Sequence, residues 1–104
     1  MPKVLIDATK GLYQTSGLGL NLSSQAVTVS GTNSVEITPT EVLVLVTTSG
    51  QDTPLTLAAG STGDVVIVAN LGADTLTDVE GLTLTANQLA MFVYTGSGWA
   101  GLAN

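Results

Sequence analysis

Between residue 26 and the C-terminus, short apolar stretches are separated by turn-forming residues about every 8 to 12 positions. Alternating apolar and polar residues indicate a strand with one covered face, and a continuous apolar run is typical of a strand covered on both faces. No apolar period of 3.6 residues lasts beyond about one turn, so little helix is expected. The expected strands lie at residues 26–30, 34–38, 41–49, 54–58, 64–70, 82–85, 88–95 and 99–102. The pattern predicts an all-β fold, an antiparallel β-sandwich or jelly roll of about eight short strands.

Two local patterns suggest how these strands connect. Gly31-Thr32-Asn33 separates two alternating segments and predicts a β-hairpin between 26–30 and 34–38. The tripeptide Leu-Thr-Leu occurs at 55–57 and again at 82–84, each time followed by a turn and an apolar run. Two similar strand-turn-strand units would explain this echo, and so would a chance likeness between threonine-rich strands.

The first 25 residues differ from the rest. Glycines at positions 11, 17 and 19 oppose both a helix and a long strand, while Leu18, Leu20 and Leu22 alternate with small polar residues. This spacing is typical of an extended segment with one face on another surface. We therefore expect an extended N-terminal arm over 1–25 and a β-domain over 26–104.

Charged residues make up only 10% of the chain, far below the ~25% of an ordinary soluble domain. Residues 1–10 contain both lysines and sum to +1, whereas the remaining residues contain seven acids, no cation and sum to −7. A body of this charge repels nucleic acid and anionic membrane surfaces, so neither is an expected partner. So little charge indicates either that partner subunits cover much of the exterior or that the exterior is a threonine-rich sheet surface.

Most of the residues that perform chemistry are missing. The chain has no histidine, cysteine or arginine, so nucleophile-and-base constellations and zinc, haem and iron–sulfur sites lose their usual residues, and neither an enzyme nor a cofactor is expected. Asp74, Asp78 and Glu80 fit a Ca²⁺ site, an acid and base pair acting on a polysaccharide, or simply a solvated rim. The apolar runs predict neither a secretion signal nor a membrane span.

The run from Leu89 to Tyr94 is apolar on both faces of the expected strand, because Leu89, Met91 and Val93 point one way and the residues between them the other. Such a strand must be covered on both sides, and we expect a neighbouring copy to supply the second cover. Trp99 fits either a lid beside Phe92 and Tyr94 or an exposed platform for a sugar or a partner side chain. The candidate core and subunit-interface residues are Leu89, Met91, Phe92, Val93, Tyr94 and Trp99.

The segments LTLAAGSTGDVVIVANLG and LTLTANQLAMFVYTGSGW, at 55–72 and 82–99, resemble small β-modules of bacteriophage virions. These modules include capsid decoration (cement) proteins, head-fibre bases and tail-fibre domains. The resemblance implies a homotrimer assembled around an axis, without catalysis.

The short chain favours a free-standing decoration protein over a fibre module within a longer chain. By the resemblance, it would be made in the host cytoplasm, sit on the outer capsid surface of the virion, and stabilise contacts between major capsid subunits. The arm would contact the major capsid protein through apolar side chains and two lysines, namely Lys3, Val4, Leu5, Ile6, Lys10, Leu12, Tyr13, Leu18 and Leu20.

Two other functions stay open at this point. The chain could be a receptor- or glycan-binding knob of a head fibre or tail fibre, with Trp99 in the contact surface. It could also be a weak carboxylate enzyme that needs Asp78 or Glu80.

Overall fold

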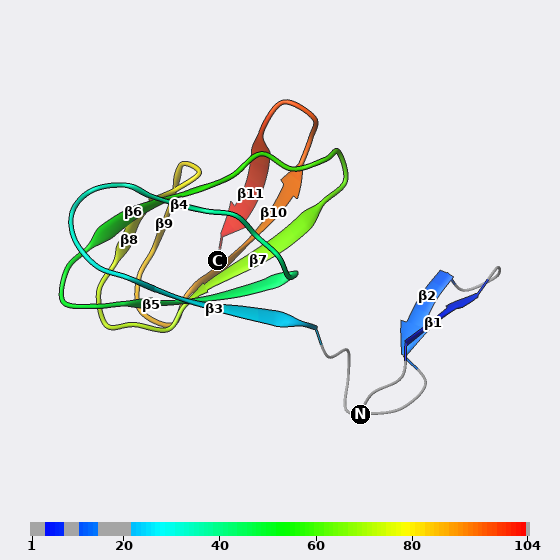
Figure 1. The fold of residues 1–104 in the computed structure, drawn as a ribbon, viewed down its shortest axis with the longest axis horizontal. Helices are drawn as coiled ribbons and strands as arrows, with labels where there is room; N and C mark the ends of the chain where they lie inside the picture. Colours follow the sequence, from blue (N-terminus) through cyan, green and yellow to red (C-terminus); the bar gives the residue numbers. More distant parts are fainter. Residues whose placement is uncertain (1–3, 8–10, 15–21, 104) are drawn as a thin grey trace.

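The computed structural model describes residues 4–7, 11–14 and 22–103, and from residue 24 onward these residues form two β-sheets around one core (Figure 1). The all-β prediction is confirmed. The five-stranded sheet has the order β11 (Trp99–Ala103), β10 (Leu89–Tyr94), β7 (Val65–Asn70), β5 (Leu43–Thr48) and β3 (Ser24–Val29). The four-stranded sheet has the order β4 (Val35–Ile37), β6 (Thr53–Leu57), β8 (Leu76–Val79) and β9 (Leu82–Leu84).

The prediction of an antiparallel sandwich is wrong in its pairing, because both sheets are mixed. From β3 to β8 the chain crosses to the other sheet after every strand, so β3, β5 and β7 lie parallel in one sheet and β4, β6 and β8 lie parallel in the other. Within these two sheets, only the pairs made by β9, β10 and β11 are antiparallel. The predicted hairpin at Gly31-Thr32-Asn33 does not form, because β3 and β4 belong to different sheets. An apolar alternation fixes which face of a strand is covered but not which strand lies beside it.

Because of these crossings the chain winds as a coil of three layers, formed by β3 with β4, β5 with β6, and β7 with β8. The turns that connect the two strands of each layer are alike in sequence. The turns contain Gly31-Thr32-Asn33-Ser34, Gly50-Gln51-Asp52-Thr53 and Gly72-Ala73-Asp74-Thr75. Side chains of the second and third turns join the two layers: the amide of Thr75 donates to Asp52 Oδ1 at 2.9 Å and the amide of Gly50 donates to Asp74 Oδ2 at 2.9 Å. The repeated unit is therefore a strand, this turn and a strand of the other sheet.

The Leu-Thr-Leu echo does not mark that repeat. Residues 55–57 lie in β6 and residues 82–84 form β9, and both strands lead into the five-stranded sheet. However, β6 pairs with β8 in parallel and β9 pairs with it antiparallel. The two segments therefore have different structural roles.

The strand count exceeds the expected eight because β8 was not predicted. In β8, Leu76 and Val79 are buried and the two residues between them are exposed. The segment therefore lacks the alternation of buried and exposed residues that indicates a strand. A shift in register against both neighbours accompanies this break.

The core between the sheets is built mainly of valine and leucine around one phenylalanine. Phe92, Leu55 and Leu84 are fully buried. Gly101 lies opposite Phe92 on β11, and a Cβ at that position would come within 2.5 Å of the Phe92 ring, so only glycine fits there. Among the described residues, no buried side-chain nitrogen or oxygen lacks a hydrogen-bond partner.

At the N-terminus, β1 (Val4–Asp7) and β2 (Gly11–Gln14) pair antiparallel as a separate two-stranded sheet. The β-body starts at Ser24, two residues inside the segment that we assigned to the arm.

Candidate functional site

The outer surface of the five-stranded sheet is apolar and uncovered by the described residues. On β10, Ala90 and Phe92 face the core and are fully buried. The alternate residues Leu89, Met91 and Val93 point outward and are 51%, 42% and 39% exposed. The strand is therefore apolar on both faces, and the chain itself covers one of them.

The neighbouring strands extend this surface in register. Met91 lies opposite Ile67 on β7 and Leu102 on β11, and Ile67 lies opposite Leu43 on β5. Because side chains alternate along every strand, the residues in phase with Met91 share its face. We call this set the outer face: Val65, Ile67, Ala69, Leu89, Met91, Val93, Ala100, Leu102, Leu43, Leu45, Thr47, Ser24, Ala26 and Thr28.

The outer face contains no charged residue. Five strands about 4.8 Å apart and six residues of about 3.3 Å each give it dimensions of about 24 by 20 Å, or about 500 Å². The apolar part of this face excludes Ser24, Thr28 and Thr47 and the buried Ala69, and exposed apolar patches of a few hundred Å² are often interaction sites. Two such faces in contact bury on the order of 1,000 Å², which reaches the lower limit for a specific protein interface.

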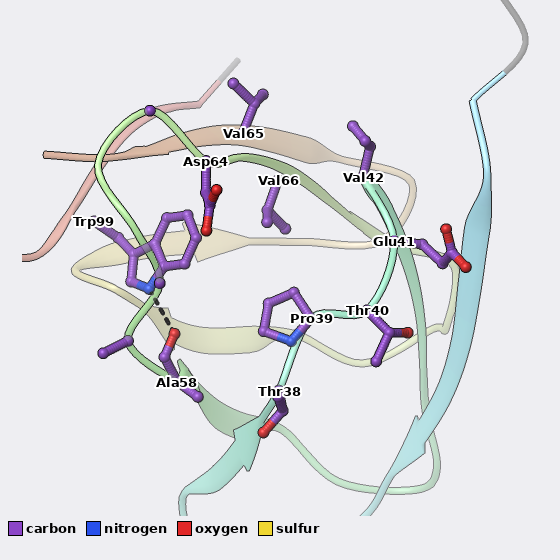
Figure 2. Close-up of a pocket in the computed structure, with 13 residues that line it drawn as sticks. Thr38, Pro39, Thr40, Glu41, Val42, Ala58, Asp64, Val65, Val66 and Trp99 are labelled. Carbon is purple, nitrogen blue, oxygen red and sulfur yellow. Dashed lines mark hydrogen bonds between the residues drawn. The ribbon is translucent and has the colours of Figure 1, made fainter. Parts of the chain in front are cut away.

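The structure also has a cavity of about 580 Å³ at the end of the body opposite the repeated turns (Figure 2). Two crossings from the four-stranded to the five-stranded sheet form its walls, residues 38–42 after β4 and residues 58–65 after β6. Its apolar lining includes Pro39, Val42, Val66 and Trp99. Its charged lining residues are Glu41 and Asp64, both exposed, and Figure 2 shows the Asp64 side chain beside Trp99 and the Glu41 side chain pointing toward β3.

Trp99 stands in the wall of this cavity with its ring held in place. The indole Nε1 donates to the carbonyl of Ala58 at 3.0 Å, and Figure 2 shows this bond. The ring meets Tyr94 edge to face, with centroids 5.1 Å apart at 73°, and packs against the core. This position matches the lid interpretation of Trp99, whose half-buried ring packs on the core on one side and lines the cavity.

The three carboxylates that suggested a cation site each bind a backbone amide in a different place. Asp74 accepts from Gly50, Asp78 accepts from Gly81 at 2.8 Å, and Glu80 accepts from Leu57 at 2.8 Å. Across the described ranges, no group of three or more acidic side chains is arranged to hold a metal ion. The cation and acid–base interpretations of these residues therefore gain no support from the geometry.

Several predicted site residues lie outside the described part of the structure. Of the arm, the backbone of Val4, Leu5, Ile6, Leu12 and Tyr13 belongs to β1 and β2, but their side chains are outside the described residues, as are Lys3, Lys10, Leu18 and Leu20 entirely. The six candidates from 89 to 99 are all described. Phe92 lies in the core, and Tyr94 and Trp99 form the aromatic pair. The other three residues, Leu89, Met91 and Val93, point outward.

The sequence analysis did not single out the rest of the outer face or the cavity. Val65 is 41% exposed and Leu102 is 70% exposed. The run 64–70 is apolar on both faces of its strand, as 89–94 is. Val65 and Ile67 could therefore have been predicted as outer-face residues from the sequence. Glu41 and Asp64 are separated by 22 intervening positions on two crossings, and only the parallel pairing of β5 with β7 brings these crossings together.

In the part of the chain that the structure describes, no helix is long and apolar enough to cross a membrane. Comparisons of the chain with models of known protein families, with curated proteins and with solved structures find no match.

Proposed function

We propose that this protein is a structural subunit that assembles with copies of itself through the outer face, and that the assembly is a homotrimeric decoration protein on the outside of a phage capsid. The observation that carries the first part is the uncharged outer face, with Leu89, Met91 and Val93 exposed on a strand whose inward residues Ala90 and Phe92 are fully buried. The resemblance of 55–72 and 82–99 to phage virion modules supports the second part.

The partner most compatible with this face is a second copy. A surface that lacks charge offers no selectivity for a charged partner, whereas a surface of the same composition, shape and size covers it completely. Three copies that turn their outer faces toward a common axis would enclose an apolar interior, shaped like a triangular prism. The scarcity of charge in the chain fits this arrangement, because the outer face, which is exposed on a single chain, would be buried in the assembly.

Attachment to the capsid is assigned to the N-terminal arm. Its apolar residues would add buried area at each of many repeated sites, so that modest contacts sum to strong attachment. Changing Leu12, Leu18 and Leu20 together to serine should abolish co-sedimentation with capsids and leave the oligomer intact.

The alternative function, a glycan-binding knob, depends on Trp99 as a platform. The indole Nε1 is already bonded to Ala58 and the ring packs on the core. The geometry of the ring therefore favours assembly over sugar binding.

Light scattering after size-exclusion chromatography tests the proposal. We expect three chain masses for the wild type and one chain mass for Met91→Glu, because a buried carboxylate would be unpaired in the interface. Thr56→Glu is the matched control, since Thr56 is exposed on the four-stranded sheet, and it should elute as the wild type does.

A two-chain mass for the wild type would keep self-assembly and contradict the trimer. A single-chain mass at every accessible concentration would overturn the proposal. Circular dichroism of Met91→Glu checks that the variant is folded.

A further inference from the structure

We propose that the cavity at Trp99 receives a lysine side chain from the N-terminal residues 1–10 of a neighbouring copy. This inference rests on the proposed self-assembly and specifies a second contact within it. It gives Lys3 and Lys10 a new partner, the cavity of the next subunit, and leaves the capsid contact to residues 11–21.

Charge complementarity is the first argument. Every cation of the chain lies in residues 1–10, which sum to +1 despite Asp7, and the rest of the chain carries seven acids. Two of these acids are the charged residues that line the cavity, Asp64 in its wall beside Trp99 and Glu41 at its rim. Within an assembly of identical chains, residues 1–10 are thus the sole source of positive side chains for these carboxylates.

The shape and lining of the cavity suit a lysine side chain. Pro39, Val42 and Val66 line it, and Figure 2 shows Asp64 beside Trp99, while the Glu41 side chain lies at the far rim and points toward β3. A lysine buries its four-carbon stem along apolar surface and keeps its ammonium at a polar rim. A volume of about 580 Å³ accommodates such a side chain together with apolar neighbours.

The Asp64 carboxylate is fixed in a position that leaves one oxygen available. Its Oδ2 accepts from the amide of Ser61 at 2.8 Å, and Oδ1 accepts no hydrogen bond from the described residues. A Cβ on Gly60 would lie 2.8 Å from this Oδ2 and 3.3 Å from the Trp99 ring, so the turn holds the carboxylate next to the indole. An ammonium at Oδ1 would form a charge-assisted hydrogen bond with the carboxylate.

Two features favour a neighbouring copy over the chain's own segment. Val65 belongs both to the cavity wall and to the outer face, so a copy seated on the outer face lies beside the cavity. The bodies also repel one another through their seven acids each, and an exchanged basic segment offsets that repulsion at the contact.

The segment leaves the body at the correct end for this exchange. Gln25, at the start of β3, donates to the carbonyl of Thr38 at 3.3 Å and accepts from the amide of Thr40 at 2.9 Å. Thr38 and Thr40 line the cavity. Each chain therefore departs beside its own cavity, and adjacent copies need to span only the distance from one cavity to the next.

Because the chain contains no cysteine, a disulfide can trap the contact in the full-length protein. We expect Thr9→Cys with Thr40→Cys to give covalent dimers or trimers on a non-reducing gel after mild oxidation. The control is Thr9→Cys with Ala86→Cys, since Ala86 is exposed between β9 and β10 at the opposite end of the body, and it should remain monomeric on the gel.

A mutant cycle that removes the charges on each side of the contact provides the second measurement, the dissociation constant of the assembly. Neutralising the cavity with Glu41→Gln and Asp64→Asn, or the segment with Lys3→Gln and Lys10→Gln, should each raise the dissociation constant of the assembly about tenfold at low salt. The combined variant should be no weaker than either alone, because both changes remove the same contact.

A disulfide formed within one chain, or no disulfide in a protein that assembles, would overturn the inference and leave the proposed function standing. Additive effects in the mutant cycle would also overturn it. If the wild type has a single-chain mass throughout, the proposed function fails first.

Discussion

The inner and outer faces of the five-stranded sheet are nearly alike in composition and opposite in environment. On β10 the inner residues Ala90 and Phe92 are fully buried, and on the same strand Leu89, Met91 and Val93 are about half exposed. The four-stranded sheet covers the inner face. Nothing in the described part of the chain covers the outer one.

The comparison shows that apolar pattern and actual burial are separate properties. A strand that is apolar on both sides needs two covers, and a body of two sheets supplies one. The proposed assembly would supply the second cover from outside the body. The four variants below each remove a packed or hydrogen-bonded side chain. Each is compared with a control substitution at an exposed residue.

Phe92→Ala should have the largest effect, a loss of about 3–5 kcal/mol in the free energy of unfolding, because it leaves a cavity at the centre of the core. Its neighbour Met91→Ala should cost below about 1 kcal/mol of chain stability while weakening assembly. Urea denaturation at several protein concentrations separates the two effects, and equal losses of stability would contradict the comparison.

Asn70→Ala should cost about 2–4 kcal/mol, since three backbone groups lose a buried partner. The Asn70 amide donates to the carbonyls of Asp74 and Leu84 at 2.7 and 3.0 Å and accepts from Gly72 at 3.1 Å. Leu71→Ala, at a residue 53% exposed, is the control and should be close to neutral. Thermal unfolding followed by circular dichroism measures both.

Asp74→Ala should cost about 1 kcal/mol, because the Gly50 amide loses its acceptor across two layers of the coil. Glu36→Ala, at an exposed carboxylate on β4, removes the same charge and should change the free energy of unfolding by less than about 0.5 kcal/mol. Equal effects in urea denaturation would show that Asp74 acts through charge alone.

Trp99→Phe should have the smallest effect, about 1 kcal/mol or less, since it removes the bond to the Ala58 carbonyl while keeping a ring against the core. The substitution removes the indole signal of the single tryptophan, but the near-ultraviolet circular dichroism signal of Tyr94 should persist because a phenylalanine ring keeps the edge-to-face contact. Loss of that signal would show that the indole, and not merely an aromatic ring, closes this end of the body. Thr77→Ser, at an exposed position on β8 of the four-stranded sheet, is the control and should leave both stability and spectrum unchanged.

The sequence located most strands well because alternation is a local property. The runs 64–70 and 88–95 match β7 and β10 to within a residue or two at each end. The segment of β8 was missed because two exposed polar residues, Thr77 and Asp78, interrupt its period.

The turns illustrate the limit of local interpretation. Gly31, Gly50 and Gly72 were each recognisable as turn residues, yet they are equivalent positions in successive layers of one coil. The side-chain bonds that join the layers, such as Asp52 to Thr75, connect residues far apart in the sequence. A single sequence shows the turns and does not show that they stack.

By itself, the sequence determined that the protein is all-β, that β10 is apolar on both faces, and that positive charge is confined to residues 1–10. These properties depend on the order and type of residues within one segment. Only the tertiary structure decided that the sheets are mixed, which face of β10 is left uncovered, and that Glu41 and Asp64 share a cavity. Strand pairing and the meeting of distant crossings depend on contacts between segments, and the free energy that selects those contacts belongs to the whole packed body rather than to any local pattern.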